Sequence, residues 1–181
     1  TVPVAAQPIM KKPGEPVPRN RREAKISNFW PDYYAAEIVE MNTLKENQTW
    51  TLTPRSELQK GTKILPTKWV YDDKIALDSN GGAFISKFKA RLTAMGNYQR
   101  EGIDFFETFA SVMRTQTFRL LLNIRLMEED NQMDQWDVKA AFINAPLPDG
   151  EKLYISQPDG HQIEGREDCV YLLDKALYGT K

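Results

Sequence analysis

The sequence predicts an α+β fold, in which helices and strands occupy separate stretches of the chain. Apolar residues recur every three or four positions in residues 31–46 and again in residues 117–129, which indicates two amphipathic helices. Strand-forming residues dominate 64–75 and 83–94, on either side of a strong turn signal, which indicates a hairpin. Because the elements do not follow a regular strand–helix–strand order, a βαβ fold is excluded.

The first 21 residues are rich in proline and cannot form a regular helix or a central strand. Val2, Val4 and Ile9 are too few to build a core in this segment. We therefore expect residues 1–21 to be a flexible Pro-rich linker and residues 22–181 to form one folded domain. A proline-rich ligand for another protein is the alternative interpretation of this segment.

The first predicted helix begins near Pro31, a residue that suits the first turn of a helix. Its apolar face is predicted to carry Tyr34, Ile38, Met41 and Leu44, which recur at helical spacing. The helix is expected to end at residues 47–49.

Strands are predicted next, at residues 50–52 and 64–75, separated by the turn-forming Pro54 and Gly61. Residues 78–82 have the sequence Asp-Ser-Asn-Gly-Gly, which is a strong turn signal. Residues 83–94 continue as the partner strand, so that the two long strands form a hairpin.

Three basic residues, Lys87, Lys89 and Arg91, alternate along the second strand of this hairpin and should share one face. Such a face could contact phosphate groups, and a merely solvated strand face is the alternative. The formal net charge of the chain is −1, which gives little long-range attraction to a polyanion. We therefore expect any nucleic-acid binding to be local to this face.

Thr117 is expected to cap the second helix. Residues 153–155 and 170–172 are predicted to pair as an antiparallel ribbon.

Cys169 and His161 are the only cysteine and the only histidine, which excludes an internal disulfide and a Cys/His zinc cluster. Cys169 is interpreted as a small buried hydrophobic residue, and His161 is assigned no chemistry.

Asp137 lies between Trp136 and Val138 in a predicted strand, so that the two apolar residues point to one face and the carboxylate to the other. A carboxylate at that surface could hold a hard cation such as Mg²⁺. One aspartate does not make a metal site, and a solvated strand residue is the alternative.

Several sequence blocks occur in a characteristic order. They are Asn47-Gln48-Thr49-Trp50, Lys68-Trp69-Val70-Tyr71, residues 87–92, residues 102–110, residues 136–144, Tyr154-Ile155-Ser156-Gln157-Pro158 and Leu173-Asp174-Lys175-Ala176-Leu177-Tyr178-Gly179. In this order the chain closely resembles the reverse transcriptase domain of copia-type LTR retrotransposons. The resemblance extends from about Arg22 to Lys181.

The resemblance implies an RNA-directed DNA polymerase of right-hand architecture, of which this chain holds the fingers hairpin and an incomplete palm. Asp137 would be the catalytic first metal-binding aspartate, with Mg²⁺ as the cofactor. Arg91, with Lys74 as a weaker candidate, would contact the triphosphate of the incoming deoxynucleotide. Phe142 would exclude the 2′-hydroxyl group of a ribonucleotide, and ordinary core packing is its alternative role. Lys87, Lys89 and Arg91 would contact the nucleic acid.

The family's other two metal-binding aspartates belong to a Tyr-X-Asp-Asp hairpin, which this sequence does not include. Tyr71-Asp72-Asp73 has a similar pattern but lies upstream of Asp137, and we interpret Asp72 and Asp73 as a solvated strand end or turn. We therefore expect the chain to be inactive alone. A non-catalytic nucleic-acid-binding module and a functionless relic of the element are the alternatives.

The expected partners are an RNA template, a DNA primer and deoxynucleoside triphosphates, together with the remainder of a polyprotein or a second copy of the chain. No apolar run approaches the roughly 18 residues that a membrane span needs, and no charged-then-apolar leader opens the sequence. These features predict a protein without membrane association, located in the cytoplasm, with the nucleus as the alternative.

Overall fold

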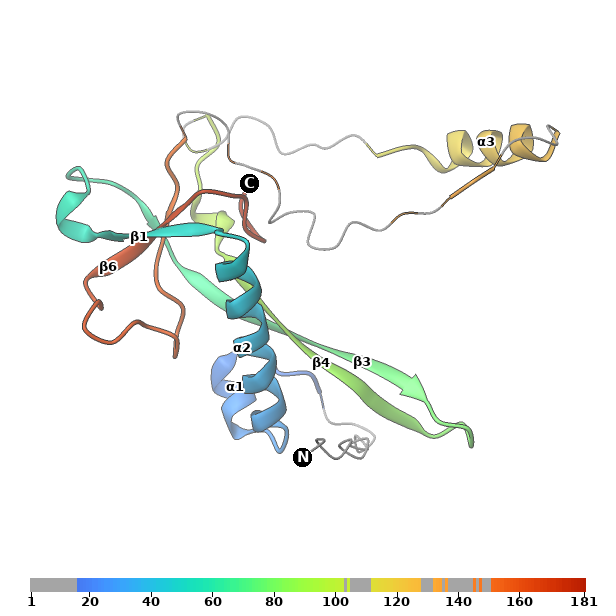
Figure 1. The fold of residues 1–181 in the computed structure, drawn as a ribbon, viewed down its shortest axis with the longest axis horizontal. Helices are drawn as coiled ribbons and strands as arrows, with labels where there is room; N and C mark the ends of the chain where they lie inside the picture. Colours follow the sequence, from blue (N-terminus) through green and yellow to red (C-terminus); the bar gives the residue numbers. More distant parts are fainter. Residues whose placement is uncertain are drawn as a thin grey trace.

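The structure is a computed structural model that describes residues 16–102, 104, 112–127, 132–134, 136, 145, 147 and 151–181. It contains a four-stranded sheet in the order β1-β6-β5-β2 and a separate two-stranded sheet, β3-β4, with helices beside them (Figure 1). The predicted α+β class is confirmed. Within the described residues, no helix is both long enough and apolar enough to cross a lipid bilayer.

Two helices open the described part of the chain. α1 spans Arg21–Ile26, and the side chain of Asn20 caps it by accepting a hydrogen bond from the Glu23 amide at 2.9 Å. The predicted boundary between linker and domain, at residues 21 and 22, thus falls inside this helix. α2 spans Trp30–Glu46, and Pro31 lies in its first turn as predicted.

The buried face of α2 differs from the predicted one. Met41 and Leu44 are buried as expected, but the other two buried residues are Tyr33 and Glu37. Tyr34 and Ile38 are 38% and 40% exposed. The prediction that Tyr34 and Ile38 lie on the buried face was wrong. It followed apolar side chains alone, whereas this helix buries the carboxylate of Glu37 together with its apolar residues.

The hairpin consists of β3, Thr67–Leu77, and β4, Ala83–Ala94, which pair in antiparallel register. Asp78 holds the turn, since its Oδ1 accepts hydrogen bonds from the amides of Asn80 and Gly82 at 2.8 and 2.7 Å. A β-bulge interrupts the register after the pair of Lys74 and Lys87, and Ser86 is the extra residue. The predicted hairpin and its turn are confirmed, but the strand predicted at residues 64–75 is divided at Pro66, and Ile64–Leu65 belongs to the other sheet.

The four-stranded sheet joins segments that are far apart in the sequence. β1, Trp50–Pro54, pairs antiparallel with β6, Cys169–Leu173. β5, Tyr154–Ile155, pairs antiparallel with β6, as predicted, and parallel with β2, Ile64–Leu65. Two short 3₁₀ helices, Arg55–Glu57 and Gly96–Tyr98, follow β1 and β4.

One hydrophobic core connects α2, the inner face of the hairpin and the four-stranded sheet. The ring of Tyr33 on α2 packs edge-on against Tyr71 of β3 and Phe88 of β4, with centroid distances of 5.2 and 5.0 Å. Fully buried members of the core include Leu44, Leu65, Leu92, Ile155, Val170 and Leu177. Cys169 is buried and unpaired, as predicted.

The remaining helix, α3, spans Thr115–Met127 and begins two residues before the predicted cap at Thr117. None of its residues is buried, and Leu120, Leu121 and Ile124 are all exposed.

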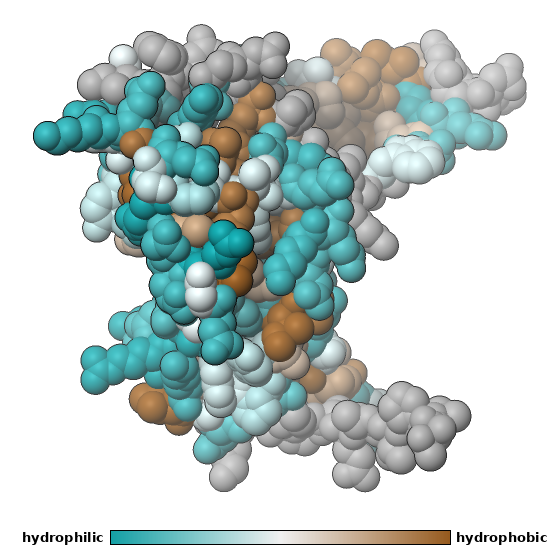
Figure 2. Space-filling model, turned by 60° about the vertical axis from the view of Figure 1, so that its left-hand side comes forward, coloured by the Kyte–Doolittle hydropathy of each residue, from teal (hydrophilic) through white to brown (hydrophobic). Residues whose placement is uncertain are grey.

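On the face drawn in Figure 2, hydrophilic side chains predominate and apolar ones gather in smaller patches.

Candidate nucleic-acid interface

The outer face of the β3-β4 hairpin carries a concentration of basic side chains. In the register of the hairpin, Lys74 lies opposite Lys87, Asp72 opposite Lys89 and Val70 opposite Arg91. Directly opposed residues point to the same side of a sheet. These pairs therefore place four cations and a single carboxylate on one face, which the exposed Lys68, opposite Thr93, also joins. The alternate residues on the other face pack against α2.

The cations on this face are close enough to affect one another. The pKa of Lys89 is lowered, first by the charge of Lys74, then by desolvation, and further by Arg91 and Lys87. Asp72 opposes the shift without cancelling it. A cluster in which one ammonium group is disfavoured by its neighbours would be stabilised by a bound anion such as phosphate.

A groove of about 160 Å³ runs beside this face, between α2 and β4. It is lined by Ala36, Val39 and Glu40 of α2 and by residues 87–91 of β4. The Glu40 carboxylate accepts a hydrogen bond from the Leu92 amide at 3.3 Å. Burial raises the pKa of Glu40 and outweighs the opposing effects of the Leu92 amide and the Arg91 charge. Glu40 therefore offsets part of the positive charge at Arg91.

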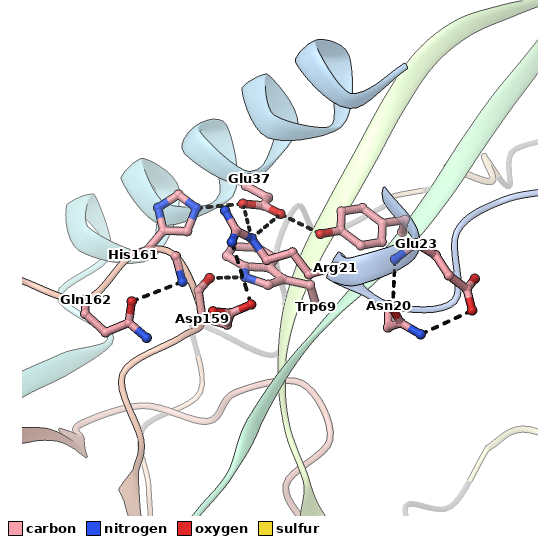
Figure 3. A network of polar contacts seen from close by, with 10 residues as sticks. Asn20, Arg21, Glu23, Glu37, Trp69, Asp159, His161 and Gln162 are labelled. Carbon is pink, nitrogen blue, oxygen red and sulfur yellow. Dashed lines mark hydrogen bonds and ion pairs between the residues drawn. The ribbon is translucent and has the colours of Figure 1, made fainter. Parts of the chain in front are cut away.

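A buried polar network holds the hairpin against the rest of the domain (Figure 3). Its centre is Glu37 on α2, which has no exposed surface. Both of its carboxylate oxygens lie 3.1 Å from Arg21 Nε, and it also accepts a hydrogen bond from the Tyr71 hydroxyl group on β3. A further partner is His161, whose Nε2 lies 2.8 Å from Glu37 Oε2.

Glu37 and these partners come from four separate segments: α2 for Glu37 itself, and α1, β3 and the loop between β5 and β6 for its partners. Asp159 of that loop extends the network, since its carboxylate lies 3.6 Å from Arg21 Nη1 and its carbonyl accepts a hydrogen bond from Trp69 Nε1 at 3.2 Å. Burial raises the pKa of Glu37, but hydrogen bonds from His161, Tyr71 and Arg21 outweigh it, so that the pKa lies below its ordinary value. Glu37 is therefore ionised, and His161 Nε2 is the donor.

Residues 47–181 match a protein family described as "Reverse transcriptase (RNA-dependent DNA polymerase)". The chain belongs to this reverse transcriptase family. It is 37% identical, over 78% of its length, to the "Retrovirus-related Pol polyprotein from transposon TNT 1-94" of Nicotiana tabacum. It is 32% identical, over 91% of its length, to the "Retrovirus-related Pol polyprotein from transposon RE2" of Arabidopsis thaliana. The predicted resemblance is confirmed.

This reverse transcriptase chain spans about 10% of the length of each of those two polyproteins. It is also 38% identical, over 62% of its length, to an uncharacterized mitochondrial protein of Arabidopsis thaliana. No solved structure matches the chain.

The structure of this reverse transcriptase segment brings some of the predicted site residues together. Lys74, Lys87, Lys89 and Arg91 form the basic face described above. The other predicted residues, Asp137 and Phe142, lie outside the described residues. Within the described part of the chain, no group of three acidic, histidine or cysteine side chains could hold a metal ion.

Asp72 and Asp73 lie within β3 of the reverse transcriptase chain and not at a strand end or turn. Asp72 is exposed on the basic face. Asp73 points to the opposite side, where its carboxylate accepts a hydrogen bond from the Tyr33 hydroxyl group at 2.8 Å. The predicted interpretation was wrong for Asp73, because the strand continues beyond it and α2 packs over it.

The sequence interpretation of this reverse transcriptase domain missed Glu37, Glu40 and His161. Glu37 could have been found, because Tyr33, Glu37, Met41 and Leu44 follow helical spacing. A charge in an apolar stripe signals a buried partner. His161 carried no such signal, since its contact with Glu37 depends on the fold.

Proposed function

We propose that the chain is the fingers and the first half of the palm of an RNA-directed DNA polymerase from a copia-type LTR retrotransposon. In this proposal the outer face of the β3-β4 hairpin contacts phosphate groups of the template, the primer and the incoming deoxynucleoside triphosphate. The observation that supports it is the cluster of Lys74, Lys87, Lys89 and Arg91 on one face of the hairpin. Membership of the reverse transcriptase family supplies the reaction class, template-directed nucleotidyl transfer.

The side chains suit different parts of that task. Arg91 has a planar guanidinium group with several donors, which matches the oxygens of a triphosphate, whereas Lys74 offers a compact point charge. Phe142 is proposed as the residue that excludes a 2′-hydroxyl group. Asp137 is proposed as one carboxylate ligand of Mg²⁺ in the complete enzyme. Because two-metal catalysis needs several converging carboxylates, we expect no activity from this chain alone.

Nucleic-acid binding without chemistry is a second candidate function. It is favoured because the basic face lies entirely within the described residues and needs no metal to bind phosphate groups. Binding of this kind would depend on salt and not on nucleotide sequence.

Binding to single-stranded RNA at several salt concentrations tests the proposed surface. Replacing Lys87, Lys89 and Arg91 by Ala should reduce the slope of log affinity against log salt, by about 0.7 for each phosphate contact that is lost. The matched control replaces the exposed Lys25, Lys60 and Lys152, which lie outside the hairpin, and should leave the affinity nearly unchanged. An unaltered salt slope in the hairpin variant would rule out this surface.

Primer extension separates the two candidate functions. The chain would be joined to a segment that carries a Tyr-X-Asp-Asp hairpin and supplied with a primed template, Mg²⁺ and deoxynucleotides. Extension that is lost on Asp137→Asn supports the polymerase. A joined chain that folds and binds the template but never extends the primer supports the binding module.

A further inference from the structure

A second groove, of about 330 Å³, lies between α2 and the loop that carries His161. Ile38, Met41, Asn42 and Lys45 line it from α2, and residues 161–163 line it from the loop between β5 and β6. Tyr171 of β6 completes the lining. The basic face of the hairpin shares none of these residues, so the groove is independent of the proposed polymerase function.

Tyr171 is the unusual member of this lining. It is 1% exposed, and its ring stacks on Trp50 with a centroid distance of 4.5 Å. Its hydroxyl group is buried and has no hydrogen-bond partner within the described residues. A buried hydroxyl group without a partner destabilises a protein, and a polar atom placed in the groove would remove that cost.

The other polar groups of the groove are mainly donors. Lys45 supplies an ammonium group and forms no salt bridge with any described residue. Gln162 already uses its carbonyl oxygen to accept from the Gly160 amide at 3.1 Å, which leaves its NH₂ group for a ligand. No carboxylate lines the groove. The polar part of a ligand that suits these donors is therefore an anion.

The apolar part of the lining is aliphatic. Ile38 and Ile163 are 40% and 38% exposed, and Met41 lies beneath them in the core. The His161 ring already stacks on Tyr34 at 5.8 Å, as the Tyr171 ring does on Trp50. A nucleobase would find no free aromatic face here, whereas an aliphatic side chain would cover the two isoleucines.

We propose that this groove binds an extended acidic peptide segment, with an aliphatic side chain against Ile38 and Ile163 and a neighbouring carboxylate on Lys45 and the Tyr171 hydroxyl group. A groove lined by a helix on one side and a loop on the other can hold an extended chain. The peptide belongs to a separate protein partner, whose acidic side chains complement the donors of the groove.

Methyl NMR of the isoleucine and methionine residues tests the proposal directly. The probe is an acetylated hexapeptide in which leucine and glutamate alternate, and the control peptide alternates leucine with lysine. The acidic peptide should shift the Ile38 and Ile163 resonances, and the basic peptide should not. Lys45→Met should weaken the acidic peptide by about tenfold, because it removes a charge-assisted hydrogen bond.

Tyr171→Phe separates binding from folding. Loss of an unpartnered hydroxyl group should leave the free protein as stable as before or more stable, while the peptide affinity falls by about three- to tenfold. Lys60→Met and Tyr154→Phe are matched controls outside the groove and should bind the peptide normally.

Equal affinity of the acidic peptide for the wild type and for Lys45→Met would overturn the proposal. Hexanoate that binds as tightly as the peptide would also overturn it, in favour of a small free carboxylate. Adenosine monophosphate that shifts the same resonances while the peptide does not would reassign the groove to nucleotides.

Discussion

The Nε2 atom of His161 lies 2.8 Å from a carboxylate oxygen of Glu37, 124 residues earlier in the chain. The contact attaches the loop between β5 and β6 to the buried face of α2. Because Glu37 also accepts hydrogen bonds from Arg21 and Tyr71, one carboxylate holds four segments in place. The orientation of the hairpin relative to the four-stranded sheet therefore depends on this side chain.

Glu37→Gln should destabilise the domain by about 3 kcal/mol, since it removes one partner of a buried ion pair and leaves Arg21 with only the exposed carboxylate of Asp159. Denaturant unfolding measures the change. Glu46→Gln, at the exposed end of α2, is the matched control and should alter the stability by less than about 0.5 kcal/mol. Equal effects of the two substitutions would show that the network contributes no net stability.

Acid should unfold the domain partly through the same carboxylate. The pKa of Glu37 is lower in the folded protein than its ordinary value of 4.5, so the unfolded chain binds a proton at higher pH than the folded one. The stabilisation is complete above the unfolded pKa and is lost as the pH falls through the folded pKa. Stability curves of Glu37→Gln should fall less steeply over this range. Some acid dependence should remain, because hydrogen bonding to Lys63 lowers the pKa of Asp104 as well.

Gly160 should be intolerant of any side chain. Its φ is +75°, and an added Cβ atom would overlap the guanidinium group of Arg21. Gly61 has a similar φ of +89° but open space around it, so it is the matched control. Gly61→Ala should cost about 1 kcal/mol for the backbone alone, and Gly160→Ala clearly more, as measured by urea unfolding. Equal costs would mean that Arg21 moves away freely.

Glu40→Gln should strengthen nucleic-acid binding at the hairpin, because it removes a negative charge close to Arg91. The pKa of Glu40 is raised by burial, so in the wild type the carboxyl group is protonated at higher pH than an ordinary glutamate. Wild-type affinity for single-stranded RNA should therefore rise as the pH falls towards that pKa, while the affinity of Glu40→Gln changes less. If the affinities of the wild type and of Glu40→Gln change with pH in the same way, Glu40 does not influence nucleic-acid binding at the hairpin.

Local patterns predicted the elements of this fold that are formed by neighbouring residues. The hairpin of β3 and β4 was predictable because its turn residues and its strand-forming sequence agree. The partners of β1 and β2 were not predicted, since sheet order depends on contacts between distant segments. Helix α2 was located correctly, but its buried face was not, because the prediction followed apolar side chains alone and did not include Glu37.

The basic residues of β4 in the candidate site were predicted from the alternation of side chains along a strand. Lys87, Lys89 and Arg91 had to share a face once the strand was identified, and register then added Lys74. The influence of Glu40 on Arg91 could not be predicted, because it depends on how α2 packs along the edge of β4. The roles of Asp137 and Phe142 remain predictions, as both lie outside the described residues.

The pairing of β1 with β6 has a consequence for synthesis of the chain on the ribosome. The backbone groups of Trp50–Pro54 cannot pair with β6 until Cys169–Leu173 has been translated. The β3-β4 hairpin, closed by the short turn at residues 78–82, can form long before that point. During this interval β1 is an unpaired strand able to associate with other nascent chains, which makes the middle of translation the period of greatest risk of misassembly.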